Sequence, residues 1–358
     1  MESHLRLLLQ MKLILHPCNL PLEHVFTISR GSTEVQPSLL VELQRDGVSG
    51  FGEAPADPFY GQTLESLAAG IGSVKTILED YEFGTPSELW ERLRPALDGN
   101  HFALSAIDIA VNDLYGRLKG QPLYRTWGLS WENVPTSSYT IGIDALDVMV
   151  RKLKERPDWP TYKIKLGTSN DLEIVRELRK HTDAAFRVDA NCGWSADETI
   201  RNSKVLADLN VEFIEQPLAP GSAVEDHQRV FSDSFLPVLA DENCQVEEDV
   251  DRCHGLFHGI NVKLCKCGGL TPALRMLRRA RELGMKTMLG CMVESSVGIS
   301  AAAHLSPLLD YADLDGAVLI SKDPASGVRI EDGLINLLDA PGSGVELVTV
   351  VARELAAS

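Results

Sequence analysis

The sequence predicts an α/β fold, in which a (β/α)₈ barrel of the TIM type carries an N-terminal α+β capping domain. Eight short apolar runs recur between Pro135 and Gly316. They follow one another at intervals of about 25 residues, and helical patterns fill the intervals, as a (β/α)₈ barrel requires. A doubly wound open sheet, the alternative, usually shows a glycine-rich phosphate turn after its first strand, and the sequence has none there.

Each of the eight predicted strands is bounded by turn or helix signals. The strands are Thr136–Ile143, Thr161–Gly167, Ala185–Asn191, Val211–Pro217, Pro237–Asn243, Gly259–Lys266, Lys286–Met292 and Tyr311–Gly316. Start signals mark the helices between them. Ser195 is placed to cap a helix over residues 196–206, and Thr271 followed by Pro272 is typical of the start of a helix that ends at Gly284.

The chain is predicted to comprise a capping domain over residues 1–125, the catalytic barrel over 126–326, and a C-terminal segment, 327–358, that returns to the cap. The capping domain lacks the period of the barrel. Its expected antiparallel strands and its helices are Met11–Ile14, Ser38–Gln44, Val48–Gly52, Glu65–Glu79, Glu88–Leu97 and Ala103–Lys119. The apolar start of the chain is interpreted as a leader before the first strand, because Gln10 and Lys12 interrupt the run that a signal peptide would need.

The composition narrows the class of protein. The chain has 358 residues and a formal net charge of −17, which argues against a surface for nucleic acid or anionic membranes. No stretch approaches the roughly 18 apolar residues that a membrane span needs. Seven cysteines without paired zinc-ligand spacing are typical of reduced thiols in a cytoplasmic protein. The expected partner is therefore a small molecule, and assembly into a homo-oligomer is a further possibility that the sequence leaves open.

Charged side chains stand at most of the predicted strand ends, which line the active site in a barrel. They are Lys163, Lys165, Asp189, Glu215, Asp241, Lys266, Asp313 and Asp315. Asp189, Glu215 and Asp241 come from neighbouring strands and would repel one another if unpaired. A hard divalent cation resolves that repulsion, and the all-oxygen set favours Mg²⁺, with Mn²⁺ as the alternative. Otherwise each carboxylate would pair with a lysine or arginine of its own.

Two lysines flank the predicted metal ligands. Lys165 precedes the first of these strands and Lys266 follows the last, so their ammonium groups are expected to face each other across the barrel mouth. Two such groups on opposite faces of a substrate permit proton removal from one face and return on the other. A cation on a substrate carboxylate would stabilise the enediolate that forms. The pattern predicts a racemase or epimerase.

Five motifs give the chain a resemblance to the enolase superfamily, and within it to the muconate-lactonizing subgroup. The motifs are Tyr162–Gly167, Val188–Trp194, Ile214–Pro217, Ala240–Asn243 and Val262–Gly269. The resemblance implies Asp189, Glu215 and Asp241 as Mg²⁺ ligands and Lys165 with Lys266 as the acid/base pair. It also implies Lys163 as the partner of the substrate carboxylate. No histidine falls at a predicted strand end, which disfavours the mandelate-racemase branch.

The last strands suggest the substrate. Asp313 and Asp315 resemble the D-x-D motif of dipeptide epimerases, where the two carboxylates would hold the α-ammonium of a dipeptide. The run from Gly290 to Ser295 is similar to the seventh strand of L-Ala-D/L-Glu epimerases, which implies substrate contacts from Cys291 and Met292. Thr140, in the first predicted strand, completes the expected substrate site on the barrel.

In the cap, Arg30 matches a loop arginine that meets the glutamate side chain in L-Ala-D/L-Glu epimerases, although an ordinary exposed arginine is the alternative. The best interpretation is thus an L-Ala-D/L-Glu epimerase. The alternatives are an N-succinylamino acid racemase, an o-succinylbenzoate synthase or a muconate cycloisomerase. A Schiff-base aldolase without a metal and a non-enzymatic binding module are more distant rivals.

Overall fold

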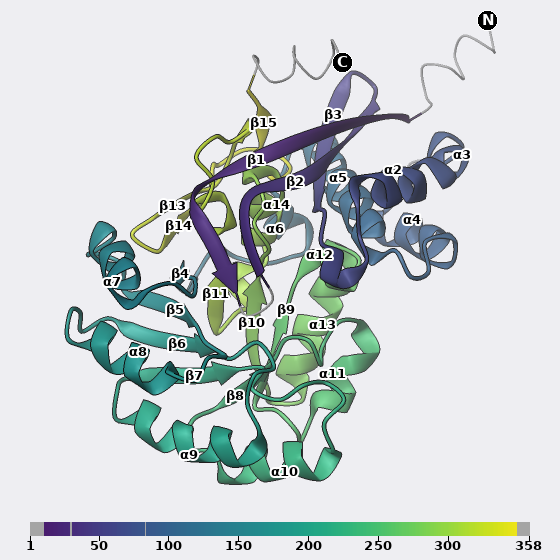
Figure 1. Cartoon of the computed structure of the whole chain (residues 1–358). Coiled ribbons are helices and arrows are strands. Elements are labelled where there is room, and N and C mark those ends of the chain that lie inside the picture. Colours follow the sequence, from purple (N-terminus) through teal and green to yellow (C-terminus); the bar gives the residue numbers. More distant parts are fainter. Residues whose placement is uncertain (1–10, 29–30, 83, 349–358) are drawn as a thin grey trace, which may run out of the picture.

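The computed structural model describes residues 11–28, 31–82 and 84–348, and it consists of a cap packed over one end of a barrel (Figure 1). Three antiparallel strands, β1 (Lys12–Ile28), β2 (Gly31–Arg45) and β3 (Val48–Pro55), form the cap sheet in that order. The cap helices are α2 (Leu64–Ser73), α3 (Lys75–Glu79), α4 (Pro86–Leu93) and α5 (His101–Lys119). The antiparallel sheet and the helices were predicted, although the strands are longer than expected.

The cap sheet lies directly against α5 because two glycines of β3 leave room for the helix backbone. A Cβ added at Gly52 would lie 2.0 Å from the carbonyl oxygen of Ala106, and one at Gly50 would lie 2.4 Å from that of Ala110. Any side chain at these positions would therefore push the helix away from the sheet. The contact joins both elements to one apolar core.

The barrel has the eight parallel strands that the sequence predicts, in sequential order from β4 to β11. They are β4 (Tyr139–Ile141), β5 (Thr161–Lys165), β6 (Ala185–Asp189), β7 (Val211–Glu215), β8 (Val238–Ala240), β9 (Gly259–Val262), β10 (Lys286–Gly290) and β11 (Tyr311–Asp313). A parallel bridge between Ser137 and Ala312 brings the two ends of the sheet together. The predicted (β/α)₈ fold is confirmed.

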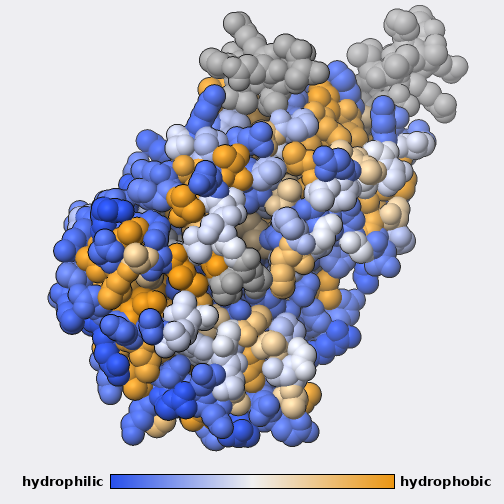
Figure 2. Space-filling model, in the orientation of Figure 1, coloured by the Kyte–Doolittle hydropathy of each residue, from blue (hydrophilic) through white to orange (hydrophobic). Residues whose placement is uncertain are grey.

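Helices surround the strands in the expected alternation (Figure 1). They are α7 (Leu146–Glu155), α8 (Asp171–Arg179), α9 (Ala196–Ala207), α10 (Val224–Asp233), α11 (Glu247–Cys253), α12 (Leu264–Cys267), α13 (Leu270–Glu282) and α14 (Ser296–Ala303). Ser195 caps α9 as predicted, in a capping box with Glu198. Polar surface covers α9 and α10 in Figure 2, because their apolar faces turn to the strands. No described helix has both the length and the apolar character to cross a membrane.

The start of α13 differs from the prediction. The helix begins at Leu270, so Thr271 lies in its first turn instead of preceding it. The Thr271 backbone N–H and hydroxyl both donate to the Asp108 carboxylate of α5, at 2.8 and 2.6 Å. This buried contact to the cap, which the sequence pattern alone does not reveal, fixes the helix start.

Two further contacts join distant parts of the chain to the cap. The buried Glu53 carboxylate of β3 accepts hydrogen bonds from the backbone N–H groups of Ser295 and Gly298, at 3.1 and 3.0 Å, at the start of α14. Near the C-terminus, the backbone N–H of Ser343 donates to Asp113 of α5 at 2.7 Å. Short strands β12 (Ala325–Ser326), β13 (Arg329–Glu331), β14 (Leu334–Asn336) and β15 (Glu346–Leu347) complete the described chain.

Candidate active site

A pocket of about 360 Å³ lies where the carboxyl ends of the barrel strands face the cap. Its barrel side carries charged and polar groups. The cap side brings Phe26 and Ile28 from β1 together with Phe59 and Tyr60, which follow β3. These four cap residues were not among the predicted site residues, because the sequence shows no periodic signal at the end of β1 or in the segment after β3. Polar side chains of the cap, among them Gln36 and Asp57, also line the pocket, so the wall opposite the charged barrel side is partly apolar and partly polar.

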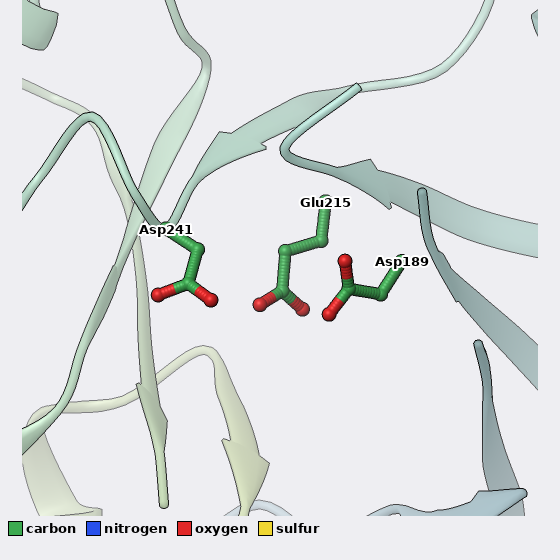
Figure 3. A group of neighbouring side chains, drawn as sticks. All are labelled: Asp189, Glu215 and Asp241. Carbon is green, nitrogen blue, oxygen red and sulfur yellow. The ribbon is translucent and has the colours of Figure 1, made fainter. Parts of the chain in front are cut away.

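Three carboxylates converge at the floor of the barrel mouth (Figure 3). Asp189 ends β6, Glu215 ends β7, and Asp241 directly follows β8. All three are buried, and each offers an oxygen within 4.8 Å of the others. Neighbouring amides orient two of them: Asn261 Nδ2 donates to Glu215 Oε1 at 2.8 Å, and the Asn191 backbone N–H donates to Asp189 Oδ1 at 2.9 Å.

The donor set fits a hard divalent cation. Three buried carboxylates supply oxygen ligands and negative charge, which are the requirements of Mg²⁺ or Mn²⁺. Burial, together with the nearby charge of Asp189, raises the pKa of Glu215 to about 7. Although burial opposes it, the neighbouring lysines hold the pKa of Asp189 and that of Asp241 below their usual range. Glu215 is therefore the carboxylate whose charge a divalent cation would stabilise most.

Lysine ammonium groups also reach these carboxylates. Lys163 Nζ lies 2.8 Å from Asp313 Oδ2, 2.8 Å from Glu215 Oε2 and 3.3 Å from Asp189 Oδ2. Lys165 Nζ lies 2.7 Å from Asp189 Oδ2. Burial would lower the pKa of Lys163, but the surrounding carboxylates hold it well above its usual range. Lys163 is shared between carboxylates, and the three proposed ligands lie together. Separate pairing of carboxylates that lie apart therefore does not describe the site.

The sixth strand ends earlier than predicted, and this changes which lysine faces the pocket. The strand β9 stops at Val262, and Lys266 lies on the helical turn α12, which Gly268 ends with a φ of +94°. The prediction that Lys266 ends a strand and faces Lys165 is therefore wrong. Lys263, the first residue after β9, lines the pocket with Lys165 instead, and its Nζ lies 2.8 Å from Asp241 Oδ2.

Sequence reasoning missed Lys263 although a signal was present. Asn261 and Lys263 stand at i and i+2, the same spacing as the strand-end pair Lys163 and Lys165. The structure shows that Lys266 is almost fully buried and that its ammonium is turned to backbone carbonyl oxygens.

Asp313 and Asp315 both line the pocket, as predicted, but in different local structures. Asp313 ends β11 and accepts a hydrogen bond from Ser138 Oγ at 2.7 Å. Asp315 begins a 3₁₀ turn and accepts one from the Thr140 backbone N–H at 2.6 Å. Burial, with the charge of Asp313, raises the pKa of Asp315 to about 7. Thr140 thus lies at the predicted place and holds Asp315 through its backbone.

The loop after β10 supplies Cys291 and Met292 to the pocket wall. The Met292 backbone N–H donates to Glu294 Oε1 at 3.0 Å, which shapes this loop. Burial, with the charge of Glu53, raises the pKa of Glu294 to about 8. Arg30, the predicted contact in the cap, lies outside the described residues.

Comparisons with known proteins identify the family. The family model described as enolase C-terminal domain-like matches residues 146–350. The family model for the N-terminal domain of mandelate racemase and muconate lactonizing enzyme matches residues 11–128. The chain belongs to the enolase superfamily. Its curated relatives in this superfamily are epimerases, and the chain is an isomerase.

Among the relatives, an L-Ala-D/L-amino acid epimerase of Flavobacterium johnsoniae is 54% identical over 338 residues, which are 94% of this chain and 100% of that protein. An L-Ala-D/L-Glu epimerase of Bacteroides thetaiotaomicron is 41% identical over 342 residues, 94% of this chain and 88% of that protein. A dipeptide epimerase of Enterococcus faecalis, solved with Mg and L-Leu-L-Tyr, has a TM-score of 0.86 and 31% identity, and the match covers 94% of this chain and 99% of that one. These findings confirm the resemblance stated from the sequence.

Proposed function

We propose that the protein is a divalent-cation-dependent dipeptide epimerase that inverts the carbon next to the dipeptide carboxylate. The observation that carries the proposal is the placement of two lysines. Lys165 ends β5 and Lys263 follows β9. In the order of the barrel sheet, β6 to β8 separate these strands on one side and β10, β11 and β4 on the other. Their ammonium groups thus approach the pocket from opposite walls.

Opposed lysines suit a two-base inversion. One lysine, neutral, removes the α-proton from one face of the substrate, and the other, protonated, returns a proton to the opposite face. The roles exchange for the reverse reaction. Lys163, fixed between three carboxylates, stays charged and is suited to attract the substrate carboxylate. Lys263 replaces Lys266 as the second base in this proposal.

Asp189, Glu215 and Asp241 would hold the cation, for which we propose Mg²⁺. When bound, the cation supplies the positive charge that makes the α-proton acidic and stabilises the enediolate. The relative from Enterococcus faecalis was solved with Mg, which supports this choice of ion. Burial would lower the pKa of Lys263, but Asp241 holds it well above its usual range. A cation at the carboxylates would offset the charge of Asp241 and so favour neutral Lys263 as a base.

The substrate is proposed to be an L-Ala-D/L-amino acid dipeptide. Asp313 and Asp315 offer two carboxylate groups to the free α-ammonium, which N-acylated substrates lack. On the cap side, Phe26, Ile28 and Phe59 offer apolar contacts to the side chain of the epimerised residue, beside the polar groups of Gln36 and Asp57. This wall supports an uncharged side chain on that residue. L-Ala-D/L-Glu becomes a further substrate if Arg30 reaches the pocket. The names of two relatives, an L-Ala-D/L-amino acid epimerase and an L-Ala-D/L-Glu epimerase, support these two substrate classes.

The expected location is the cytoplasm. All seven cysteines are free thiols in the structure, as reducing conditions would keep them. Fractionation of the native host with an antibody to the protein tests this part of the proposal.

A dipeptide library screened in D₂O tests the activity, with α-deuterium uptake and chiral separation as readouts. We expect uptake and inversion with L-Ala-Xaa dipeptides, loss of both in EDTA, and recovery with Mg²⁺. Preference for N-succinylamino acids over every free dipeptide would favour the racemase alternative. Activity that survives EDTA and is trapped by borohydride would indicate a Schiff-base aldolase.

A further inference from the structure

Lys266 is buried behind Asp241, whereas Lys263 reaches the same carboxylate from the pocket. Lys263 lines the pocket and bonds Asp241 Oδ2 at 2.8 Å. Lys266 is 1% exposed, and its Nζ donates to the other carboxylate oxygen, Oδ1. The two lysines thus hold the two oxygens of one carboxylate from different sides.

The hydrogen bonds of Lys266 occupy its whole ammonium group. An ammonium has three N–H bonds. Lys266 finds three oxygen acceptors: the Asp241 carboxylate, the Asp241 backbone carbonyl at 2.6 Å and the Cys244 backbone carbonyl at 3.2 Å. Two of the three are backbone carbonyls of the loop that follows β8. Lys266 therefore fixes both the side chain of Asp241 and the loop that carries it.

The cap in turn holds the backbone around Lys266. Trp90 Nε1 of α4 donates to the Gly268 carbonyl at 2.9 Å. His101 Nδ1, at the start of α5, lies 3.0 Å from the Lys266 carbonyl. Cys265, next to Lys266, belongs to the apolar core of the cap. The ammonium is thus anchored to a rigid part of the fold, which a positioning group requires.

We propose that Lys266 is a positioning residue that holds the Asp241 carboxylate toward Asp189 and Glu215 and thereby sets the affinity of this site for a divalent cation. The inference rests on the proposed function for the cation itself. It assigns Lys266 no contact with the substrate and no proton transfer.

The effect of its charge and the effect of its hydrogen bonds have opposite signs. A positive charge near the site repels a cation, so removal of the charge alone would strengthen cation binding. Loss of the three hydrogen bonds would release Asp241 and the loop, and so weaken cation binding. Lys263 carries the same charge to the same carboxylate without bonds to the loop carbonyls. Lys263→Met is therefore the matched control for Lys266→Met.

The experiment is a titration of the full-length protein with Mn²⁺ in the absence of substrate. Calorimetry and the spin-resonance signal of free Mn²⁺ measure the binding. We expect the Kd of Lys266→Met to exceed that of Lys263→Met by about ten- to a hundredfold, the usual effect of removing a group that orients a metal ligand. Lys180→Met, at an exposed position, should bind as the wild type does. Equal Kd values for Lys263→Met and Lys266→Met would overturn the proposal.

A milder variant keeps the test decisive if Lys266→Met does not fold. Lys266→Gln retains donors for a carbonyl, and its Kd should still exceed that of Lys263→Met several-fold. At saturating Mn²⁺ in D₂O, Lys266→Gln should exchange the α-proton of both epimers, whereas loss of exchange with one epimer would show that Lys266 is a base. A wild type that binds no Mn²⁺ would overturn both proposals. A wild type that binds Mn²⁺ but inverts no dipeptide would overturn the proposed function alone.

Discussion

Replacement of Asp315 by asparagine tests the proposed ammonium site. Asparagine keeps the shape of the side chain and an oxygen that can accept the Thr140 N–H, which now lies 2.6 Å from Asp315 Oδ2. The variant should therefore fold normally. It loses only the negative charge that would face the α-ammonium of a dipeptide.

The magnitude follows from the burial of Asp315. A hydrogen bond to a charged group contributes about 1.5–3 kcal/mol and a neutral one about 0.5–1.5 kcal/mol, so the charge accounts for about 1–1.5 kcal/mol. That difference corresponds to a loss of about five- to twelvefold in kcat/KM. Because Asp315 is only 2% exposed, water screens the charge little, and the loss should lie toward the upper value.

The pH dependence adds a second readout. Since burial raises the pKa of Asp315 to about 7, its charge is present above that pH and disappears below it. The ratio of wild-type to Asp315→Asn kcat/KM for a free dipeptide should therefore be greatest near pH 8 and approach one below about pH 6. Because both proteins share their lysines, titration of the lysines cancels in this ratio.

The assay is the initial rate of L-Ala-Xaa epimerisation, followed by chiral chromatography from about pH 5.5 to about pH 8.5. An N-acetylated dipeptide, which has no ammonium, serves as the substrate control. Asp332→Asn, which makes the same change in an exposed turn, serves as the control variant. An equal loss with both substrates, or a ratio that does not change with pH, would refute the ammonium site.

Three further predictions concern the cation, the cap and the substrate side chain. Dialysis against EDTA should abolish epimerisation and lower the Tm, because the carboxylates would then repel one another; full activity after complete removal of divalent ions would contradict the metal site. Glu53→Gln should lower the free energy of unfolding by about 1–3 kcal/mol, measured in urea, because the amide NH₂ replaces a carboxylate oxygen and cannot accept the hydrogen bonds from Ser295 and Gly298; an unchanged midpoint would show that this cap contact adds no stability. Arg30→Met should reduce kcat/KM for L-Ala-L-Glu more than for L-Ala-L-Leu, and an equal effect on both would exclude an arginine–glutamate contact.

The sequence predicted the barrel because its signal is periodic. Each strand buries a short apolar run, and the register of β5 with β6, and of β6 with β7, places Lys165, Asp189 and Glu215 side by side. Asp241 follows β8 and completes the carboxylate group. The position of these groups follows from strand ends alone, so one sequence was enough to find them.

The positions that were missed depend on where a strand stops. The run 259–266 is apolar enough to continue as a strand, but backbone hydrogen bonds from Lys266 and Cys267 to the Lys263 carbonyl turn it into a helix. Because the strand ends earlier than predicted, Lys263 and not Lys266 faces the pocket. The cap wall, with Phe59 and Tyr60, could not be predicted, because the packing of the cap on the barrel brings together segments that have no common sequence signal.

The most direct test of the two-base account is the stereochemistry of α-proton exchange in D₂O by Lys165→Ala and Lys263→Ala at saturating Mg²⁺. Each variant is expected to lose epimerisation, because one of the two faces of the substrate lacks its base. Each should still exchange the α-proton of one epimer, and the two variants should select opposite epimers, as mass spectrometry and chiral chromatography will show. Near-wild-type epimerisation by either variant, or selection of the same epimer by both, would contradict the account.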